Sequence, residues 1–172
     1  MPAANKYVIK PLGDENRAAF LCGEEELDRY LHERASRDVK NKLSAVFILV
    51  SEEDPERILG YYTLSAQQVD SSLLPEELKK KTGRYKHLGV TLLGRLAVAK
   101  NQQGKGLGAL LLVSALRQAL ESTERVMSFA VVVDAKNEDA ASFYEKFGFI
   151  RLSDRRLLLP MKTVELNFSR KQ

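Results

Sequence analysis

Glycines at alternate positions give the strongest chemical signal in this sequence. They lie in the run Gln103, Gly104, Lys105, Gly106, Leu107 and Gly108, which follows a predicted strand and opens a predicted helix. Glycine lets the backbone turn tightly and keeps side chains away from the main-chain N–H groups. Those N–H groups and the positive end of the helix favour a bound pyrophosphate. A plain strand-to-helix turn is the alternative, but it does not require glycine at alternate positions.

The spacing of these glycines excludes two common phosphate loops. A nucleoside triphosphate loop has Lys-Ser or Lys-Thr after its last glycine, whereas Ala109 and Leu110 follow Gly108 here. The dinucleotide fingerprint has glycines at its first, third and sixth positions, which this run does not match. The predicted anion site is therefore of another kind.

Tyr144 is predicted to lie in the core when its helix is considered by itself. Ala140, Phe143, Tyr144 and Phe147 form one stripe of a predicted helix over residues 137–147. The hydroxyl of a core tyrosine is expected to be hydrogen-bonded. Asn137 begins that helix, and a capping role and a cofactor contact both remain open for it.

The other segments predict the elements that hold these residues. Strands are predicted at residues 7–9, 45–50, 58–65, 92–98, 127–133 and 157–159, and further helices at residues 24–36, after Leu74 and Pro75, and at residues 107–120. The strand-helix-strand order after residue 92 makes its two strands parallel, whereas the turn at residues 52–55 favours an antiparallel pair. We expect an α/β (α+β) fold with a mixed sheet, helices on both faces and a single domain over residues 1–172.

Gln103, Gly106 and Gly108 resemble the Gln/Arg-x-x-Gly-x-Gly motif of the GNAT superfamily of N-acetyltransferases. The resemblance extends upstream to Leu96-Ala97-Val98 and downstream to Asn137-x-x-Ala140-x-x-Phe143-Tyr144-x-x-x-Gly148-Phe149. It implies the GNAT fold, in which the strands matching residues 92–98 and 127–133 are parallel and splay apart. The pantetheine arm of acetyl-CoA enters the gap between them.

The resemblance also implies roles for individual residues. Main-chain groups of Leu96 and Val98 would pair with the pantetheine, and the N–H of Val98 or a neighbour would polarise the acetyl carbonyl. Tyr144 would protonate the departing thiolate. A phenol with a pKa near about 10 stays protonated at neutral pH, whereas a thiol has a pKa near about 8.5, so this direction of transfer is sensible. No carboxylate is identifiable as a general base. The implied cofactor contacts are Leu96, Ala97, Val98, Gln103, Gly104, Lys105, Gly106, Leu107, Gly108, Asn137 and Phe143.

A closer resemblance points to the GNAT toxins of type II toxin-antitoxin pairs. It rests on Phe20-x-Cys22-Gly23-x-x-x-Leu27-Asp28-x-Tyr30-Leu31, Gly60-Tyr61-Tyr62-Thr63-Leu64-Ser65, Leu93-Gly94-Arg95-Leu96-Ala97-Val98 and Leu159-Pro160-Met161-Lys162-Thr163. That group acetylates the α-amino group of aminoacyl-tRNA and thereby blocks translation. The resemblance implies a ribbon-helix-helix antitoxin, contact with DNA only through that antitoxin, and a homodimer.

The candidates for contacting the acceptor stem of the tRNA are Lys79, Lys80, Lys81, Arg84, Lys86 and Arg95. The sequence departs from the group where prolines usually surround Arg84-Tyr85.

Charge and composition set further bounds. The chain has 27 Lys and Arg against 23 Asp and Glu, and its bases concentrate in residues 76–86 and in the tail from Arg151. Such runs hold polyanions or are simply solvated surface. His32 and His87 lack the spacing of zinc ligands, and the lone Cys22 predicts no internal disulfide. No apolar run is long enough for a membrane span and no secretory signal is evident, so we expect a cytoplasmic protein.

Two other functions remain open at this point. The same fold and cofactor would serve acetylation of a small amine or a protein amine. The second alternative is a catalytically silent module that binds coenzyme A or a partner. The presence of the motif residues speaks against it: Gln103, Gly106, Gly108 and Tyr144. A small antitoxin gene beside this one would favour the toxin.

Overall fold

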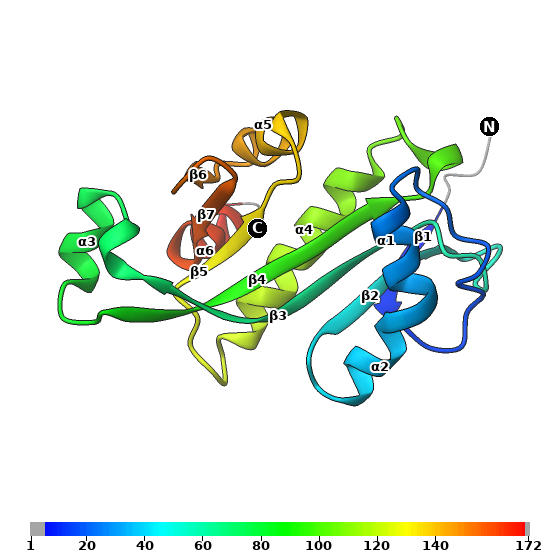
Figure 1. Cartoon of the computed structure of the whole chain (residues 1–172), viewed down its shortest axis with the longest axis horizontal. Helices are drawn as coiled ribbons and strands as arrows, with labels where there is room; N and C mark the ends of the chain where they lie inside the picture. The colour runs from blue at the N-terminus through cyan, green and yellow to red at the C-terminus, as the bar shows by residue number, and fades with distance from the viewer. Residues whose placement is uncertain (1–5, 171–172) are drawn as a thin grey trace. The chain divides into compact units, whose positions relative to one another are not determined.

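A computed structural model describes residues 6–170 of the chain (Figure 1). These residues form two compact units, and each is described by itself. The first unit contains the chain up to Ser65 together with Arg95–Ala115. The second contains Ala66–Gly94 and the chain from Leu116 onward. The single domain over residues 1–172 stays a prediction.

The first unit is built on antiparallel strands. β1 (Tyr7–Pro11) pairs with β2 (Ala45–Ser51), and β2 pairs with the first part of β3 (Gly60–Asp70). The helical stretch before β2 consists of α1 (Glu25–Arg29), a π-helical turn η1 (Tyr30–Arg34) and α2 (Ala35–Lys40). The predicted antiparallel pair is confirmed, and the predicted helix over residues 24–36 continues to Lys40.

Helices cover both faces of this antiparallel sheet. Ile48 and Tyr61 are paired across β2 and β3 and pack in one core cluster with Tyr30 and Leu31 of the helical stretch. On the other face, the hydroxyls of Tyr62 and Ser114 are 2.9 Å apart. Ser114 belongs to α4 (Leu107–Ser122), which follows a short 3₁₀ turn η3 (Lys100–Gln102). The alternation of side chains along β3 thus places successive tyrosines against different helices.

The second unit contains the parallel strands. β4 (His87–Val98) pairs in parallel with β5 (Ala130–Asp134), and β5 pairs antiparallel with β7 (Arg156–Pro160), whose other edge carries β6 (Ile150–Arg151). The hydrogen-bonded order of all strands is β1-β2-β3-β4-β5-β7-β6, so the predicted mixed sheet is confirmed. This unit also contains η2 (Ser71–Leu73), α3 (Glu76–Thr82), α5 (Glu138–Lys146) and α6 (Met161–Ser169).

The structure corrects several predicted boundaries. β5 begins at Ala130 rather than residue 127, and Met127 is 84% exposed. The apolar run therefore starts before the strand that it predicts. β6 and α6 were not predicted. α6 begins directly after Pro160, where proline is tolerated before a helix, and it buries Met161 and Val164 one turn apart. None of the helices over residues 6–170 is long and apolar enough to cross a membrane.

Candidate functional site

The glycine run forms an open main-chain cradle at the start of α4. Gly104 and Gly106 have φ of +82° and +81°, and Lys105 between them is outside the positive-φ region. Alternation of this kind turns successive N–H groups toward one concave side, which is an anion-binding arrangement. A Cβ at Gly104 or Gly106 would meet nothing within 4 Å, so the conformation rather than crowding requires glycine. The cradle is thus open and fits a pyrophosphate.

The remaining residues of the run support this cradle. Leu107 is 3% exposed, so its side chain anchors α4 and only its main chain can face an anion. The ammonium group of Lys105 donates to Oε1 of Gln102 at 3.1 Å and stays at the exposed surface of the loop. Gly108 lies in the first turn of α4, where N–H groups have no partner within the helix.

The side chain of Gln103 braces the loop instead of facing an anion. Its Nε2 donates to the main-chain oxygen of Cys22 at 2.8 Å and to that of Val98 at 3.0 Å. These bonds join the loop to the segment before α1 and to the end of β4. The predicted cofactor contact of Gln103 is therefore left to its main chain.

The end of β4 exposes main-chain groups on one edge. The oxygen of Ala97 lies 2.9 Å from the position of a Cβ on Gly60 in β3. Because main-chain groups alternate along a strand, those of Leu96 and Val98 point to the opposite edge. The register between β4 and β5 ends at Leu93 and Val133, five residues before the end of β4. The main chain of Leu96 and the N–H of Val98 are therefore available to an added extended ligand, whereas the oxygen of Val98 accepts from Gln103.

Tyr144 has a buried ring and an uncommitted hydroxyl. Its ring packs edge-on against Phe143 and Phe149, with centroids 5.2 Å and 5.5 Å away. Within residues 6–170 the hydroxyl makes no hydrogen bond, yet no buried side-chain polar atom there lacks a partner, so the oxygen retains some solvent access. A purely structural buried tyrosine normally has its hydroxyl bonded. Burial raises the pKa of Tyr144, which keeps it protonated at neutral pH.

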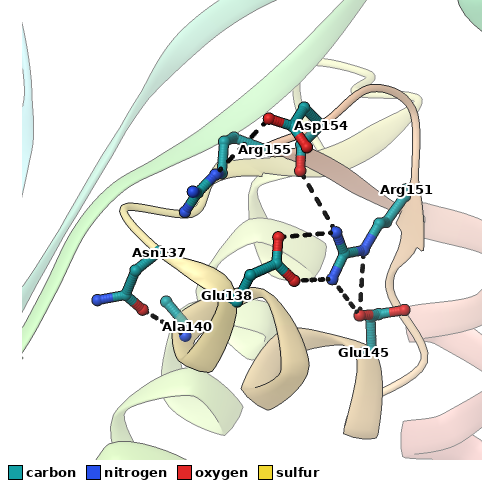
Figure 2. A network of polar contacts seen from close by, with 7 residues as sticks. All are labelled: Asn137, Glu138, Ala140, Glu145, Arg151, Asp154 and Arg155. Carbon is teal, nitrogen blue, oxygen red and sulfur yellow. Dashed lines mark hydrogen bonds and ion pairs between the residues drawn. The ribbon is translucent and has the colours of Figure 1, made fainter.

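Asn137 caps the helix that carries Tyr144. Its Oδ1 accepts a hydrogen bond from the N–H of Ala140 at 2.8 Å, as Figure 2 shows. The capping role left open by the sequence is thus confirmed. The short asparagine side chain carries the oxygen that accepts from an N–H of the first helical turn. Phe143, the other predicted cofactor residue of this helix, is half-buried and also packs on Phe147.

Arg151 fastens both ends of α5 (Figure 2). Its Nη2 donates to Glu138 in the first turn at 2.9 Å and to Glu145 in the last turn at 2.8 Å. Its Nη1 also reaches the main-chain oxygen of Asp154 at 3.4 Å. The hydrogen bond from Arg151 lowers the pKa of Glu138, and the two carboxylates raise the pKa of Arg151. Sequence analysis missed this role because the partners lie 13 and 6 residues before the arginine.

Five of the predicted basic residues belong to the second unit, and Arg95 belongs to the first. Lys79 and Lys86 line one cavity of the second unit and Lys81 lines another groove, whereas Lys80 and Arg84 are exposed outside both. Arg95 belongs to the first unit, where its guanidinium carbon lies 3.5 Å from the centroid of the Tyr30 ring. Stacking on that aromatic ring engages the guanidinium.

Part of the basic tail is engaged in ion pairs. Arg156 pairs with Asp134 at 2.7 Å, as Arg151 does with Glu138 and Glu145. Arg151 and Arg156 are therefore paired within the protein, and the interpretation of the tail as a polyanion site stays a prediction. Lys171 of the same tail lies outside the described residues. Among residues 6–170 no cluster of ligating side chains could hold a metal ion.

Comparison with known proteins gives matches over most of the chain. Residues 12–149 match the model described as "Acetyltransferase (GNAT) family". A tRNA-acetylating toxin of Mycobacterium tuberculosis is 30% identical over 131 residues, which cover 76% of each chain.

Two solved structures of AtaT match nearly the whole chain. AtaT complexed with acetyl-methionyl-tRNAfMet has a TM-score of 0.87 and 32% identity, and the match covers 95% of this chain and 99% of that one. A tyrosine-to-phenylalanine mutant of the AtaT toxin, bound to the C-terminus of the antitoxin AtaR and acetyl-CoA, has a TM-score of 0.81 and 30% identity. That match covers 95% of this chain and 98% of the other.

Proposed function

Because the chain belongs to the acetyltransferase (GNAT) family, we propose that it transfers the acetyl group of acetyl-CoA to the α-amino group of aminoacyl-tRNA and thereby blocks translation. The observation that carries this proposal is the open glycine cradle before α4, formed by Gly104 and Gly106 with positive φ. The similarity to tRNA-acetylating toxins supports the choice of acceptor.

The residues that would hold acetyl-CoA lie in two segments of the first unit. Main-chain N–H groups of residues 103–108 would bind the pyrophosphate. The main chain of Leu96 and the N–H of Val98 would pair with the pantetheine amides in the manner of an added strand. Acetyl-CoA supplies the acetyl group as a reactive thioester. The side chain of Gln103 is engaged within the protein, so its contact would come from its main chain. The cap uses the Oδ1 of Asn137, and a cofactor contact through its Nδ2 stays a prediction.

The chemistry assigned to this chain consists of proton donation and carbonyl polarisation. The Tyr144 hydroxyl would give its proton to the sulfur as the C–S bond breaks and the C–N bond forms. The N–H of Val98 would donate to the acetyl oxygen, where negative charge develops. A neutral amine attacks without a protein base, and its released proton passes to solvent, from which Tyr144 is reprotonated.

The proposal includes partners and a setting. We propose that the protein acts in the cytoplasm as a homodimer and is neutralised by a small ribbon-helix-helix antitoxin. Its contact with DNA would occur only through that antitoxin. The complex of an AtaT mutant with the C-terminus of AtaR supports an antitoxin partner.

The test is acetylation by the purified protein with radiolabelled acetyl-CoA and either charged or deacylated total tRNA. We expect label only on charged tRNA, and its release from the RNA when the aminoacyl ester is hydrolysed. Absence of label on RNA despite acetyl-CoA binding would contradict the proposed acceptor and point to a protein or small amine. Absence of acetyl-CoA binding would contradict the role of the glycine cradle.

A further inference from the structure

The turn region between β3 and β4 contains a basic cavity to which the acetyl-transfer chemistry assigns no role. In Figure 1, α3 lies at the end of these two long strands. The N–H of Ser71 donates to the oxygen of Lys86 at 2.9 Å and closes the base of this region. The cavity has a volume of about 730 Å³ and is lined by Asp70, Ser71, Ser72, Lys79, Thr82, Gly83, Lys86 and His87. All of these residues belong to the second unit.

The lining has the chemistry of a phosphate site. Lys79 and Lys86 supply ammonium groups, and Ser71 and Ser72 supply hydroxyl donors. Asp70 is the one carboxylate of the lining, and its Oδ1 already accepts from the N–H of Ser72 at 2.8 Å. The positive charge therefore exceeds the negative charge, and the acid is held in a local turn.

Ion pairs with neighbouring side chains neutralise only part of the positive charge of the two lysines. The Nζ of Lys79 lies 3.3 Å from Glu76 on the same face of α3, but that carboxylate is 81% exposed and the pair is correspondingly weak. No ion pair is found for Lys86 within residues 6–170. Hydrogen bonds from Ser72 and, to a smaller extent, the charges of His87 and Lys86 lower the pKa of Asp70. Lys86 thus faces one carboxylate of the cavity without forming an ion pair with it, whereas Lys79 forms one with Glu76.

An exposed tyrosine directly precedes Lys86 in the chain, although it is not part of the cavity lining. Tyr85 is 68% exposed, and its N–H donates to the oxygen of Thr82 at 2.9 Å in the turn after α3. A phenol at the surface can donate to a phosphate oxygen or a 2′-hydroxyl, and its ring can lie against a ribose. Arg84 and Lys86 flank it in the chain. The cavity and Tyr85 together suit a sugar-phosphate backbone better than a free anion.

We propose that this cavity binds a backbone phosphate of the tRNA substrate and that Tyr85 contacts the adjoining ribose. The inference rests on the proposed function, because it names a second contact with the same acceptor. It also divides the predicted RNA-binding residues: Lys79 and Lys86 bind the phosphate, whereas Lys80 contributes only general attraction.

The experiment measures the binding of deacylated tRNA to the full-length protein at several salt concentrations. We expect Lys86→Gln to weaken binding roughly three- to tenfold and to reduce the salt slope by about 1, as the loss of one phosphate contact does. Lys80→Gln is the matched comparison, since it removes the same charge from an exposed lysine of α3 outside the cavity. It should have the smaller effect. Thermal unfolding of each variant confirms that it folds.

Three results would overturn the inference. One is an equal effect of Lys86→Gln and Lys80→Gln on tRNA binding. Another is a rise in the KM for acetyl-CoA in Lys86→Gln without a change in tRNA affinity, which would assign the cavity to the donor. The third is that inorganic phosphate binds in the cavity to saturation but does not reduce the binding of tRNA. Wild-type protein that binds tRNA through Lys86 but acetylates no aminoacyl-tRNA would contradict the proposed function while supporting this contact.

Discussion

The side-chain amide of Gln103 donates a hydrogen bond of 2.8 Å to the main-chain oxygen of Cys22, which lies 81 residues earlier in the chain. A second bond of 3.0 Å reaches the oxygen of Val98. Both acceptors are carbonyls, so the site requires a donor. The amide thereby fixes the glycine loop against two separate segments of the first unit.

Replacement of Gln103 should weaken acetyl-CoA binding in a defined order. Gln103→Ala loses both hydrogen bonds, each worth about 1 kcal/mol. Gln103→Glu keeps the shape but brings a carboxylate against two carbonyl oxygens, so its effect should be larger. We expect the KM for acetyl-CoA to rise from wild type to Ala to Glu, with a smaller change in kcat. Equal values for Ala and Glu would show that the amide is not a donor to these oxygens.

Tyr144→Phe should remove most of the activity and leave stability intact. We expect kcat to fall by about 10² to 10⁴, the usual contribution of a general acid. The hydroxyl makes no hydrogen bond within residues 6–170, so no bond is lost on substitution. Steady-state kinetics and thermal unfolding check both halves of this prediction. Unchanged turnover would exclude Tyr144 as the proton donor.

Alkaline pH should destabilise the protein through its buried tyrosines. Burial is the main cause that raises the pKa of Tyr30, Tyr61 and Tyr144 above the ordinary tyrosine value. The folded chain therefore binds more protons than the unfolded chain once the latter ionises. The stability that the protonated buried tyrosines contribute is fully present below about pH 10, and it is lost progressively as the pH rises above that value. Urea unfolding from about pH 8 to about pH 11 measures the decline in the free energy of unfolding. A flat profile would contradict the assignment.

Arg151 should act on catalysis through the position of α5. Arg151→Lys retains the charge but cannot span Glu138 and Glu145 with a planar fork. We expect a several-fold lower kcat, a nearly unchanged KM for acetyl-CoA and a lower melting temperature. In a Tyr144→Phe background the same change should have no further effect on the residual rate, because the arginine acts through the tyrosine. An equal loss in both backgrounds would assign Arg151 a purely structural role.

Gly60 permits the close approach of β3, β4 and α4 in the first unit. A Cβ there would lie 2.8 Å from Cδ1 of Leu111 and 2.9 Å from the main-chain oxygen of Ala97. Gly60→Ala should therefore lower the free energy of unfolding by about 1–3 kcal/mol, as overpacking does. Gly89→Ala is the control, since a Cβ at Gly89 meets nothing within 4 Å. Equal stability of the two variants would contradict the contact.

The local features of the site follow from the sequence alone. Glycine at positions 104 and 106 predicts the turning loop, and both residues have positive φ. Asn137 before two acidic residues predicts an N-cap, and the capping bond is present. The order of strands and helices after residue 92 predicts parallel pairing, which β4 and β5 show. Each of these depends on residues close together in the chain, whose backbone preferences act directly.

The tertiary structure decided the features that depend on distant residues. Gln103 is predicted as a cofactor contact, yet its partners Cys22 and Val98 make its side chain a brace. Arg95 is predicted to bind RNA, which stays a prediction, and only the structure shows that its guanidinium carbon lies 3.5 Å from the centroid of the Tyr30 ring. The cavity at Lys79 and Lys86 exists only because η2, α3 and the start of β4 fold together. Spacing along the chain determines local conformation. It does not determine which distant carbonyl, ring or carboxylate a polar side chain will contact, because that depends on how the helices and strands pack.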